Sequence, residues 1–278
     1  MILVVDALNK HRHGEILDEM FRLRARVFGG RLGWDVKIVD GREIDEFDDL
    51  DPAYVIGLDE DYNVVACVRA LQTTGPHMLS DVFSEILQGQ PPLRSATLWE
   101  STRFCVDTDI LKMSGQGAGT VSRATCELMV ASLEYARASG IEDIITVIDP
   151  VMNRVLKRSD NAPYDNAPYD YVGETVQMGK TKALAALLDC SEERIARVRA
   201  FAGIEGDVFI DEDVLIECRA ARTRAASISE NVSEDLAKYL IEQIDGARNE
   251  QELVAALALA EQLVGPVSGP ADKAFVSG

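Results

Sequence analysis

The stretch from Leu98 to Asp107, LWESTRFCVD, decides how the centre of this protein is built. Apolar residues alternate with others along it, which is the pattern of a buried β-strand. Glu100 and Arg103 place two charges in this strand, three positions apart. Side chains an odd number of positions apart point to opposite faces of a regular strand, so these charges could share one cleft only if the strand is irregular.

The composition of the 278-residue chain is that of a globular protein, with 47% apolar and 27% charged residues. Its formal net charge of −19 argues against a surface for duplex nucleic acid, which requires a basic patch to neutralise phosphates. We therefore expect no nucleic-acid partner.

The five cysteines are odd in number and scattered through apolar contexts, a pattern typical of reduced thiols in a cytosolic protein. The only three histidines, at positions 11, 13 and 77, lack the spacing of metal ligands, so we expect no metal. The amino terminus MILVVDALNK resembles a first strand more than a signal peptide, and no apolar window approaches membrane-spanning length. These features predict a soluble, cytoplasmic protein with no membrane span.

The order of the expected elements predicts a mixed α/β (α+β) fold with a single, largely antiparallel sheet flanked by helices. Residues 15–28 have helical periodicity, and 53–58 with 63–71 read as a hairpin around the turn DEDYN. The further expected elements are helices over 78–88, 120–138, 150–158 and 191–201, and strands over 97–106, 143–149, 171–178 and 208–218.

The sequence predicts three parts: a catalytic domain over 1–218, a helical hairpin over 219–264 and a flexible tail over 265–278. The hairpin would pack on the main domain or on a partner, so we consider a homo-oligomer formed through these helices. The direct repeat NAPYD-NAPYD at 161–170 is turn chemistry and predicts an irregular loop.

Charged residues at apolar-flanked positions are the informative ones, because an unpaired buried charge is costly. Each has a structural explanation when it is taken alone: a solvated helix face, a polar loop, a core aromatic or an ordinary strand pair. The features are Arg24, Trp34, the acidic group Glu43, Asp45 and Asp48, Arg69 within its strand, and Glu100 with Arg103.

Four segments in this order resemble the acyl-homoserine-lactone synthases, the bacterial quorum-sensing signal (autoinducer) synthases: FRLRARVFGGRLGWDV, GREIDEFDD, VVACVRALQTT and LWESTRF. The resemblance covers roughly residues 1 to 200. It implies a fold like that of the GCN5-related N-acetyltransferases, in which central strands splay apart at a bulge. A bulge around Ser101 or Thr102 would reverse the local phase and let Glu100 and Arg103 line one cleft.

The resemblance implies that S-adenosylmethionine is joined to an acyl thioester. Its amine attacks the thioester carbonyl, and its carboxylate then attacks the γ-carbon, which closes the lactone and releases 5′-methylthioadenosine. The amine must lose a proton to become a nucleophile, and we expect Glu100 to be the general base. S-adenosylmethionine is a cosubstrate here, and no cofactor is expected.

The family's positions imply which residues bind the cosubstrate. Asp45 and Asp48 would attract its sulfonium and ammonium, whereas Arg69 and the catalytic-site Arg103 would bind its carboxylate. Phe28, Trp34 and Phe104 would supply aromatic contacts. Arg24 would tie the N-terminal segment to the acidic group.

The acyl donor has two candidates. Acyl-carrier protein is the default that the resemblance implies, with Lys157, Arg158, Lys180 and Lys182 as a basic docking surface. Lys112 to Gly119, KMSGQGAG, is similar to the glycine-rich pyrophosphate loop of the acetyltransferases, and Lys112, Gly115 and Gly117 would then bind an acyl-coenzyme A.

The acyl chain is expected to lie in an apolar pocket behind the bulge, lined by Met129, Leu133, Ile145, Thr146 and Val147. The resemblance associates a hydroxyl at Thr146 with 3-oxo acyl chains, while a β-branched residue that fills a strand is an equal explanation.

Two other functions remain open at this point. One is an N-acyltransferase that never closes a lactone and does not consume S-adenosylmethionine. The other is a catalytically silent interaction module that acts through its C-terminal helices.

Overall fold

The structure is a computed structural model, and it describes residues 1–108, 121–161, 171–179, 181–229, 234–246 and 250–264. The chain divides into two compact units, Met1–Phe209 and Ile210–Gly278. The expected boundary at 218/219 falls inside a helix, α7 (Glu212–Ser229), so the compact units divide earlier in the chain. The functional division into domains stays a prediction.

The first unit contains a seven-stranded sheet in the order β1-β4-β5-β6-β7-β9-β8. All neighbouring strands are antiparallel except β6 and β7, which are parallel. The predicted mixed α/β fold with a largely antiparallel sheet is therefore confirmed. The strands are β1 (Ile2–Val5), β4 (Ala53–Leu58), β5 (Val64–Gln72), β6 (Leu98–Val106), β7 (Asp143–Ile148), β8 (Tyr171–Met178) and β9 (Thr181–Asp189).

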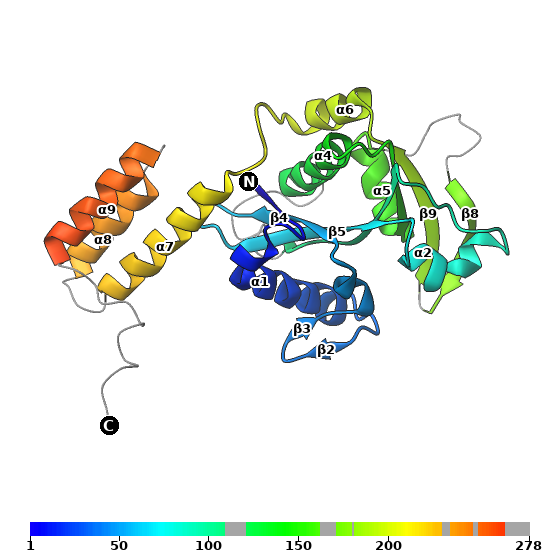
Figure 1. Cartoon of the computed structure of the whole chain (residues 1–278), viewed down its shortest axis with the longest axis horizontal. Helices are drawn as coiled ribbons and strands as arrows, with labels where there is room; N and C mark the ends of the chain where they lie inside the picture. Colours follow the sequence, from blue (N-terminus) through cyan, green and yellow to red (C-terminus); the bar gives the residue numbers. More distant parts are fainter. Residues whose placement is uncertain (109–120, 162–170, 180, 230–233, 247–249, 265–278) are drawn as a thin grey trace. The chain divides into compact units, whose positions relative to one another are not determined.

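Helices cover both faces of this sheet (Figure 1). On one face, here called the α4 face, α4 (Arg123–Ala138) packs on β4 and β5 and contacts α6 (Glu192–Ala202). On the opposite face, here called the α1 face, α1 (Gly14–Arg24) packs on β5. The α1 face also carries the short helix α2 (Met78–Asp81) and the 3-10 turn η4 (Ser84–Leu87). The main hydrophobic core lies between the sheet and α4.

Short elements follow α1 along the chain. A wide π-helical turn, η2 (Ala25–Arg31), extends α1, so the expected helix over 15–28 has two parts. A small hairpin of β2 (Ile38–Val39) and β3 (Arg42–Glu43) comes next, and the 3-10 turn η3 (Glu46–Leu50) carries the acidic group. After β7 comes α5 (Pro150–Arg158).

One expectation from the sequence is wrong, and one strand was not predicted. Residues 208–218 do not form a strand: Asp211 accepts hydrogen bonds from the backbone N–H groups of Asp213 and Val214 and so starts α7. Strand β9 was not expected, because its sequence TKALAALLD has the composition of a helix. Pairing with β7 and β8 overrides that local preference.

The second unit contains α7, α8 (Glu234–Asp245) and α9 (Glu250–Val264). Leu240 of α8 and Ala260 of α9 are buried in one small apolar cluster, so the expected helical hairpin is present. An oligomer formed through these helices stays a prediction. The NAPYD repeat from residue 162 and the tail from residue 265 lie outside the described residues.

Within the described part of the chain, no helix is both long and apolar enough to cross a membrane. The same residues hold no cluster of histidine, cysteine and carboxylate side chains that could bind a metal ion. All five cysteines are buried free thiols.

Candidate active site

A β-bulge in β6 places Glu100 and Arg103 on the same face of the sheet. Cys67 of β5 pairs with Cys105, whereas Arg69 pairs with Thr102, so two residues of β6 lie opposite Val68 alone. Arg103 takes up the extra length with a φ of 55°, in the left-handed region that non-glycine residues seldom adopt. The sequence predicted such a bulge, and the structure places it at Arg103 and Phe104 instead of Ser101 or Thr102.

Strands β6 and β7 separate next to this bulge. Their pairing ends at Ser101 and Thr146, where the Thr146 hydroxyl donates to the Ser101 carbonyl over 2.9 Å. Beyond that point β6 follows β5 to Val106, and β7 follows β9 to Ile148. The sheet therefore opens beside the residues that carry the charges.

Three arginines and three carboxylates meet on the α1 face, and we call them the ionic cluster: Arg24, Arg69, Arg103, Glu43, Asp45 and Asp48. Arg24 Nε donates to Glu43 over 2.6 Å, and both of its terminal nitrogens donate to Asp48, over 2.8 and 2.9 Å. The contact expected between Arg24 and the acidic group is therefore present. It joins α1 to β3 and η3, which are distant from α1 in sequence.

The other two arginines complete the cluster. Arg69 donates to Asp45 over 2.5 Å and to Asp48 over 2.7 Å, and its Nε donates to the Thr102 hydroxyl over 3.0 Å. Arg103 donates to Glu43 over 3.0 Å and to Asp45 over 2.6 Å. Each carboxylate thus bonds to two arginines, and the charges of the six side chains cancel.

Burial divides the cluster into an interior and a rim. The side chains of Arg24, Arg69, Glu43 and Asp48 are at most 3% exposed, whereas those of Asp45 and Arg103 are 12% and 11% exposed. Burial opposes the charge of Asp48, but Arg24 and Arg69 outweigh it and hold its pKa well below the usual range. We infer that the interior is a fixed scaffold, and that Asp45 and Arg103 form the edge that a ligand can reach.

Glu100 is fully buried beside the cluster and bonds to backbone instead of an arginine. Its two oxygens accept hydrogen bonds from the N–H groups of Met78, over 2.7 Å, and Leu79, over 2.6 Å. Burial raises the pKa of Glu100 to about 7, although these N–H groups and Arg69 oppose the rise. A carboxyl group with this pKa exchanges a proton readily near neutral pH, as general-base chemistry requires.

Met78 links Glu100 to the arginines. Its sulfur lies 3.4 Å from Arg69 Nη2 and 3.4 Å from Arg103 Nη1, while its backbone N–H donates to Glu100. No role was predicted for Met78 or Leu79 from the sequence. Periodicity shows that a helix is present there but not that its first amide groups bind a buried glutamate, so no sequence signal could have found this contact.

The aromatic candidates separate into two groups. Phe28 is buried and Trp34 is 42% exposed; their rings stack with centroids 5.1 Å apart, and the Arg103 guanidinium lies 5.7 Å from the Phe28 ring. Phe104 does not join them, because the bulge turns it to the α4 face, where it packs against the main core. Phe104 thus lies on the face opposite the ionic cluster, and its expected contact with the cosubstrate stays a prediction.

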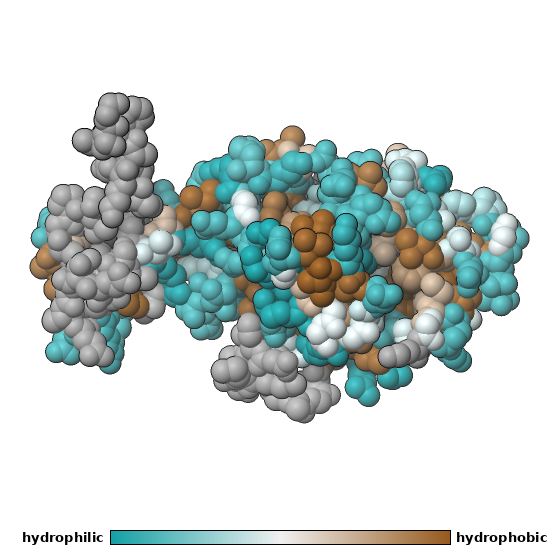
Figure 2. Space-filling model, turned by 90° about the horizontal axis from the view of Figure 1, so that it is seen from below, coloured by the Kyte–Doolittle hydropathy of each residue, from teal (hydrophilic) through white to brown (hydrophobic). Residues whose placement is uncertain are grey.

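Trp34 is one of several exposed hydrophobic residues in its segment of the chain. Figure 2 looks from below onto the α1 face and shows apolar residues gathered within largely hydrophilic surroundings. The exposed large hydrophobic residues of segment 31–39 are Leu32, Trp34, Ile38 and Val39.

The five residues expected to line the acyl pocket do not meet in one place. Met129 and Leu133 belong to the core on the α4 face. Thr146 points to the same face, because it lies two positions from Ile144 and from Ile148 of that core. Ile145 and Val147 instead pack on the α1 face, in the cluster of Leu79 and Ile86. Neighbours on a strand point to opposite faces, so residues 145–147 could not all line one pocket.

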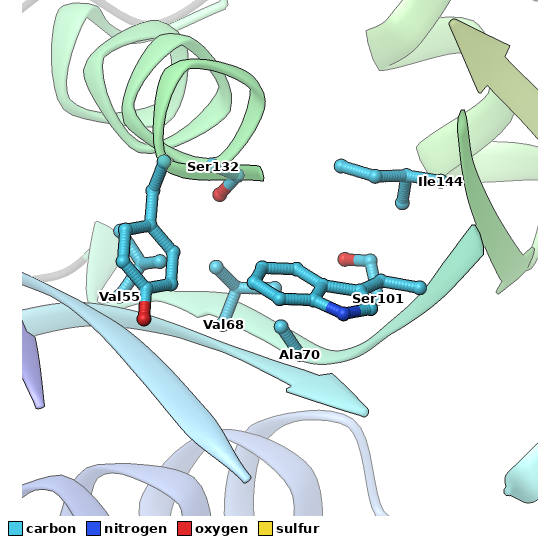
Figure 3. Close-up of a pocket in the computed structure, with 8 residues that line it drawn as sticks. Val55, Val68, Ala70, Ser101, Ser132 and Ile144 are labelled. Atoms are coloured by element: carbon cyan, nitrogen blue, oxygen red, sulfur yellow. The ribbon is translucent and has the colours of Figure 1, made fainter. Parts of the chain in front are cut away.

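A small apolar pocket does lie on the α4 face, next to the opening between β6 and β7 (Figure 3). The Ser132 hydroxyl of α4 and the rings of Trp99 and Tyr135, 5.6 Å apart, lie around it. None of its lining residues was predicted from the sequence: Val55, Val68, Ala70, Trp99, Ser101, Ser132, Tyr135 and Ile144.

The donor-binding candidates lie partly outside the described residues, which exclude Lys112, Gly115, Gly117 and Lys180. Lys157 and Arg158 are exposed at the end of α5. The Lys157 ammonium lies 5.7 Å from the ring of Tyr171, beside a second pocket between α5 and β8.

Sequence comparison relates the chain to known proteins. The sequence model of the autoinducer synthase family matches residues 8–198. The chain is 36% identical over 197 residues to an acyl-homoserine-lactone synthase of Agrobacterium fabrum, covering 71% of this chain and 90% of that protein. It is also 38% identical over 149 residues to an acyl-homoserine-lactone synthase of Pseudomonas aeruginosa, covering 52% of this chain and 71% of that protein.

Solved structures show the same likeness. The CoA-dependent acyl-homoserine lactone synthase MesI superposes with a TM-score of 0.63 at 26% identity, covering 76% of this chain and all (100%) of that one. The AHL synthase LasI superposes with a TM-score of 0.59 at 28% identity, covering 76% and 98%. The helices of the second unit lie beyond the region that the family model matches.

Proposed function

The chain belongs to the autoinducer synthase family, the acyl-homoserine-lactone synthases, and is an acyltransferase; we propose that it makes an N-acyl-L-homoserine lactone from S-adenosylmethionine and an acyl thioester. The family membership supports the reaction class. The ionic cluster, Glu100 and the opening between β6 and β7 support the assignment of its steps to residues.

The observation that carries this proposal is the environment of Glu100. The group is buried, its pKa is raised to about 7 by that burial, and it shares a face of β6 with Arg103. At neutral pH a substantial fraction of the Glu100 carboxyl is ionised. Each of its oxygens accepts one hydrogen bond from an α2 amide and can accept another. Glu100 therefore takes a proton from the substrate ammonium, directly or through one water, and frees the amine for attack.

The rim of the ionic cluster suits the amino-acid end of S-adenosylmethionine. Asp45 and Arg103 form a pair over 2.6 Å, and an ammonium beside a carboxylate presents the complementary pair of charges. The ligand ammonium binds Asp45 and its carboxylate binds Arg103, so each charge exchanges one ionic partner for another. Asp48 and Arg69 hold this rim in place, and the exposed ring of Trp34 is available to the sulfonium or the adenine.

Two bonds are made in the reaction. The amine attacks the thioester carbonyl, the tetrahedral intermediate collapses, and the thiol leaves with a proton to give an amide. The substrate carboxylate then attacks the γ-carbon, the C–S bond of the sulfonium breaks with its electron pair on sulfur, and 5′-methylthioadenosine leaves. The products are the acyl-homoserine lactone, 5′-methylthioadenosine and the free thiol.

We place the acyl chain where β6 and β7 separate, on the α4 face. Met129, Leu133 and Thr146 belong to that face, and the pocket of Figure 3 adjoins it. Ile145 and Val147 pack on the opposite face of the sheet and are not part of this proposed pocket. The apolar lining suits a hydrocarbon chain, which gains free energy by leaving water.

The donor is an acyl-carrier protein in the main proposal, bound near the exposed Lys157 and Arg158. An acyl-coenzyme A is the alternative, which the likeness to the CoA-dependent synthase MesI favours. Lys112, Gly115 and Gly117 would hold its pyrophosphate. We propose a cytoplasmic location with either donor.

The test is an assay of the purified protein with S-adenosylmethionine and matched sets of acyl-carrier-protein and acyl-coenzyme A thioesters. Mass spectrometry follows 5′-methylthioadenosine and the acylated product. We expect acyl-homoserine lactone together with methylthioadenosine, lost in Glu100→Gln and retained in the control Glu60→Gln, which changes an exposed glutamate of a turn.

Other outcomes would replace the proposal. Thioester cleavage without methylthioadenosine indicates an N-acyltransferase that does not close a lactone. Absence of turnover with every donor indicates an interaction module. Full activity of Glu100→Gln removes Glu100 from the role of base while it leaves the reaction itself intact.

A further inference from the structure

The connection from β5 to α2, residues 73–77, leads directly to the two amides that bind Glu100. Thr73 begins it, fully buried, and its hydroxyl lies 2.8 Å from the Leu98 carbonyl at the start of β6. The backbone N–H of Ser95 donates to the same hydroxyl over 3.1 Å. The first residue of the connection is thus tied to the strand that carries Glu100.

Arg94 holds the middle of this connection. Its Nη1 lies within hydrogen-bond distance of three consecutive carbonyl oxygens, those of Thr73 at 3.3 Å, Thr74 at 3.2 Å and Gly75 at 2.5 Å. Carbonyl groups that converge on one point repel each other unless a cation or donor lies between them. The guanidinium of Arg94, an exposed arginine, supplies that donor.

His77 connects the carbonyls to the helix. Its Nδ1 lies 3.0 Å from the Gly75 carbonyl. In the chain, His77 is followed immediately by Met78 and then Leu79. The imidazole is buried, and its Nε2 has no hydrogen-bond partner. Burial lowers the pKa of His77. A carbonyl oxygen only accepts, so the Nδ1–H group of the ring donates to Gly75.

We propose that Arg94 is a positioning residue for Glu100: by gathering the carbonyls of residues 73–75 it fixes, through His77, the place of the Met78 and Leu79 amides that bind the Glu100 carboxylate. Arg94 acts on Glu100 through these backbone groups and not by a direct hydrogen bond. The inference rests on the proposed role of Glu100 as the general base.

The effect on Glu100 has a definite sign. The groups that face its carboxyl are the Met78 and Leu79 amides and Asp81 from α2, and Arg69 from β5. The amides favour the ionised form, so loosening them raises the pKa of Glu100. The base is then ionised only at higher pH, so the rising limb of the pH profile of kcat/KM shifts to higher pH.

The experiment compares wild type with Arg94→Ala, Arg94→Lys and the matched control Arg137→Ala, which removes an exposed arginine paired with Glu192 on the surface. Amide hydrogen exchange of Met78 and Leu79 is measured on the protein without substrate. The pH profile of kcat/KM is measured with S-adenosylmethionine and the preferred thioester.

We expect Arg94→Ala to speed amide hydrogen exchange at Met78 and Leu79. It should also shift the rising limb of kcat/KM to higher pH by about one unit, which lowers kcat/KM about tenfold at pH values below the midpoint of the limb. Arg94→Lys, which keeps a cationic donor, should lie between Arg94→Ala and wild type. Arg137→Ala should match wild type in both measurements.

The inference is overturned if Arg94→Ala leaves the rising limb of kcat/KM at the same pH. It is also overturned if amide hydrogen exchange speeds up equally throughout the protein. Equal behaviour of Arg94→Lys and Arg94→Ala also overturns it. If wild type forms no lactone, the proposed function fails instead, and the amide exchange still decides whether Arg94 holds α2. If Arg94→Ala does not fold, the comparison of Arg94→Lys with wild type in the same two measurements tests the inference instead.

Discussion

Glu100 and Arg103 contact the same methionine from one face of β6. The Met78 N–H donates to Glu100 over 2.7 Å, and Arg103 Nη1 lies 3.4 Å from the Met78 sulfur. In a regular strand these side chains would point in opposite directions, and the bulge opposite Val68 removes that obstacle. A carboxyl group and a guanidinium thus lie on one face of β6, as the proposed binding of an ammonium and a carboxylate requires.

Glu100→Gln should alter how stability depends on pH. Below pH 4.5 the carboxyl is protonated in both folded and unfolded chains; between 4.5 and about 7 only the unfolded chain ionises, so the wild type loses stability as pH rises. The advantage of the variant over wild type should grow across this window by about 3 kcal/mol. Urea unfolding of both proteins from pH 4 to 8 measures it, and a constant difference would contradict the raised pKa.

Arg24→Met should destabilise the fold strongly. It removes an arginine that bonds both Glu43 and Asp48 and leaves two buried carboxylates short of a partner. We expect a loss of about 3–5 kcal/mol in the free energy of unfolding, measured by urea denaturation. The control Arg22→Ala, an exposed neighbour paired with Asp18, should cost less than about 1 kcal/mol. Equal losses in the two variants would show that the interior of the cluster is not a scaffold.

Arg103→Gly should be more stable than Arg103→Ala. The φ of 55° at this position costs an alanine about 1 kcal/mol that glycine does not incur. Both variants lose the ion pairs with Glu43 and Asp45, so both should lose nearly all synthase activity. Thermal denaturation and the coupled assay measure the two effects; an alanine variant as stable as the glycine variant would argue against the bulge.

Asp45→Asn and Asp48→Asn should separate binding from stability. Asp45 lies at the rim, so its change should raise the KM for S-adenosylmethionine about tenfold or more with a small loss of stability. Asp48 is buried and bonds to Arg24, Arg69 and Tyr54, so its change should cost several kcal/mol of stability. Calorimetric binding and urea unfolding test both, and a reversed order would refute the division into interior and rim.

A chain that ends at residue 211 should retain lactone synthesis. The family match ends at residue 198, and the first unit contains the ionic cluster, Glu100 and the whole sheet. We expect kcat/KM within about threefold of the full chain, which is below 1 kcal/mol. Light scattering of both chains tests whether the C-terminal helices make an oligomer. A folded but inactive truncated protein would assign those helices a part in catalysis.

Local sequence patterns predicted much of the fold. The turn DEDYN predicted the β4–β5 hairpin, and apolar periodicity predicted α4 and α5. The patterns failed at β9, whose alanines and leucines suit a helix, and at α7, where alternating residues concealed the cap formed by Asp211. At β9 the pairing with β7 and β8 decided the outcome, whereas at α7 the deciding contact is a local cap that apolar alternation does not reveal.

The sequence by itself determined which charged residues are present and that Glu100 and Arg103 need an irregular strand to meet. The tertiary structure alone decided where the bulge lies, and therefore that Phe104 faces away from the ionic cluster and that Ile145 and Thr146 point to opposite sides. It also decided that α2 binds Glu100 and that each carboxylate bonds to two arginines. The physical reason is that strand phase and ion pairing depend on register between segments far apart in the chain, which no local pattern specifies.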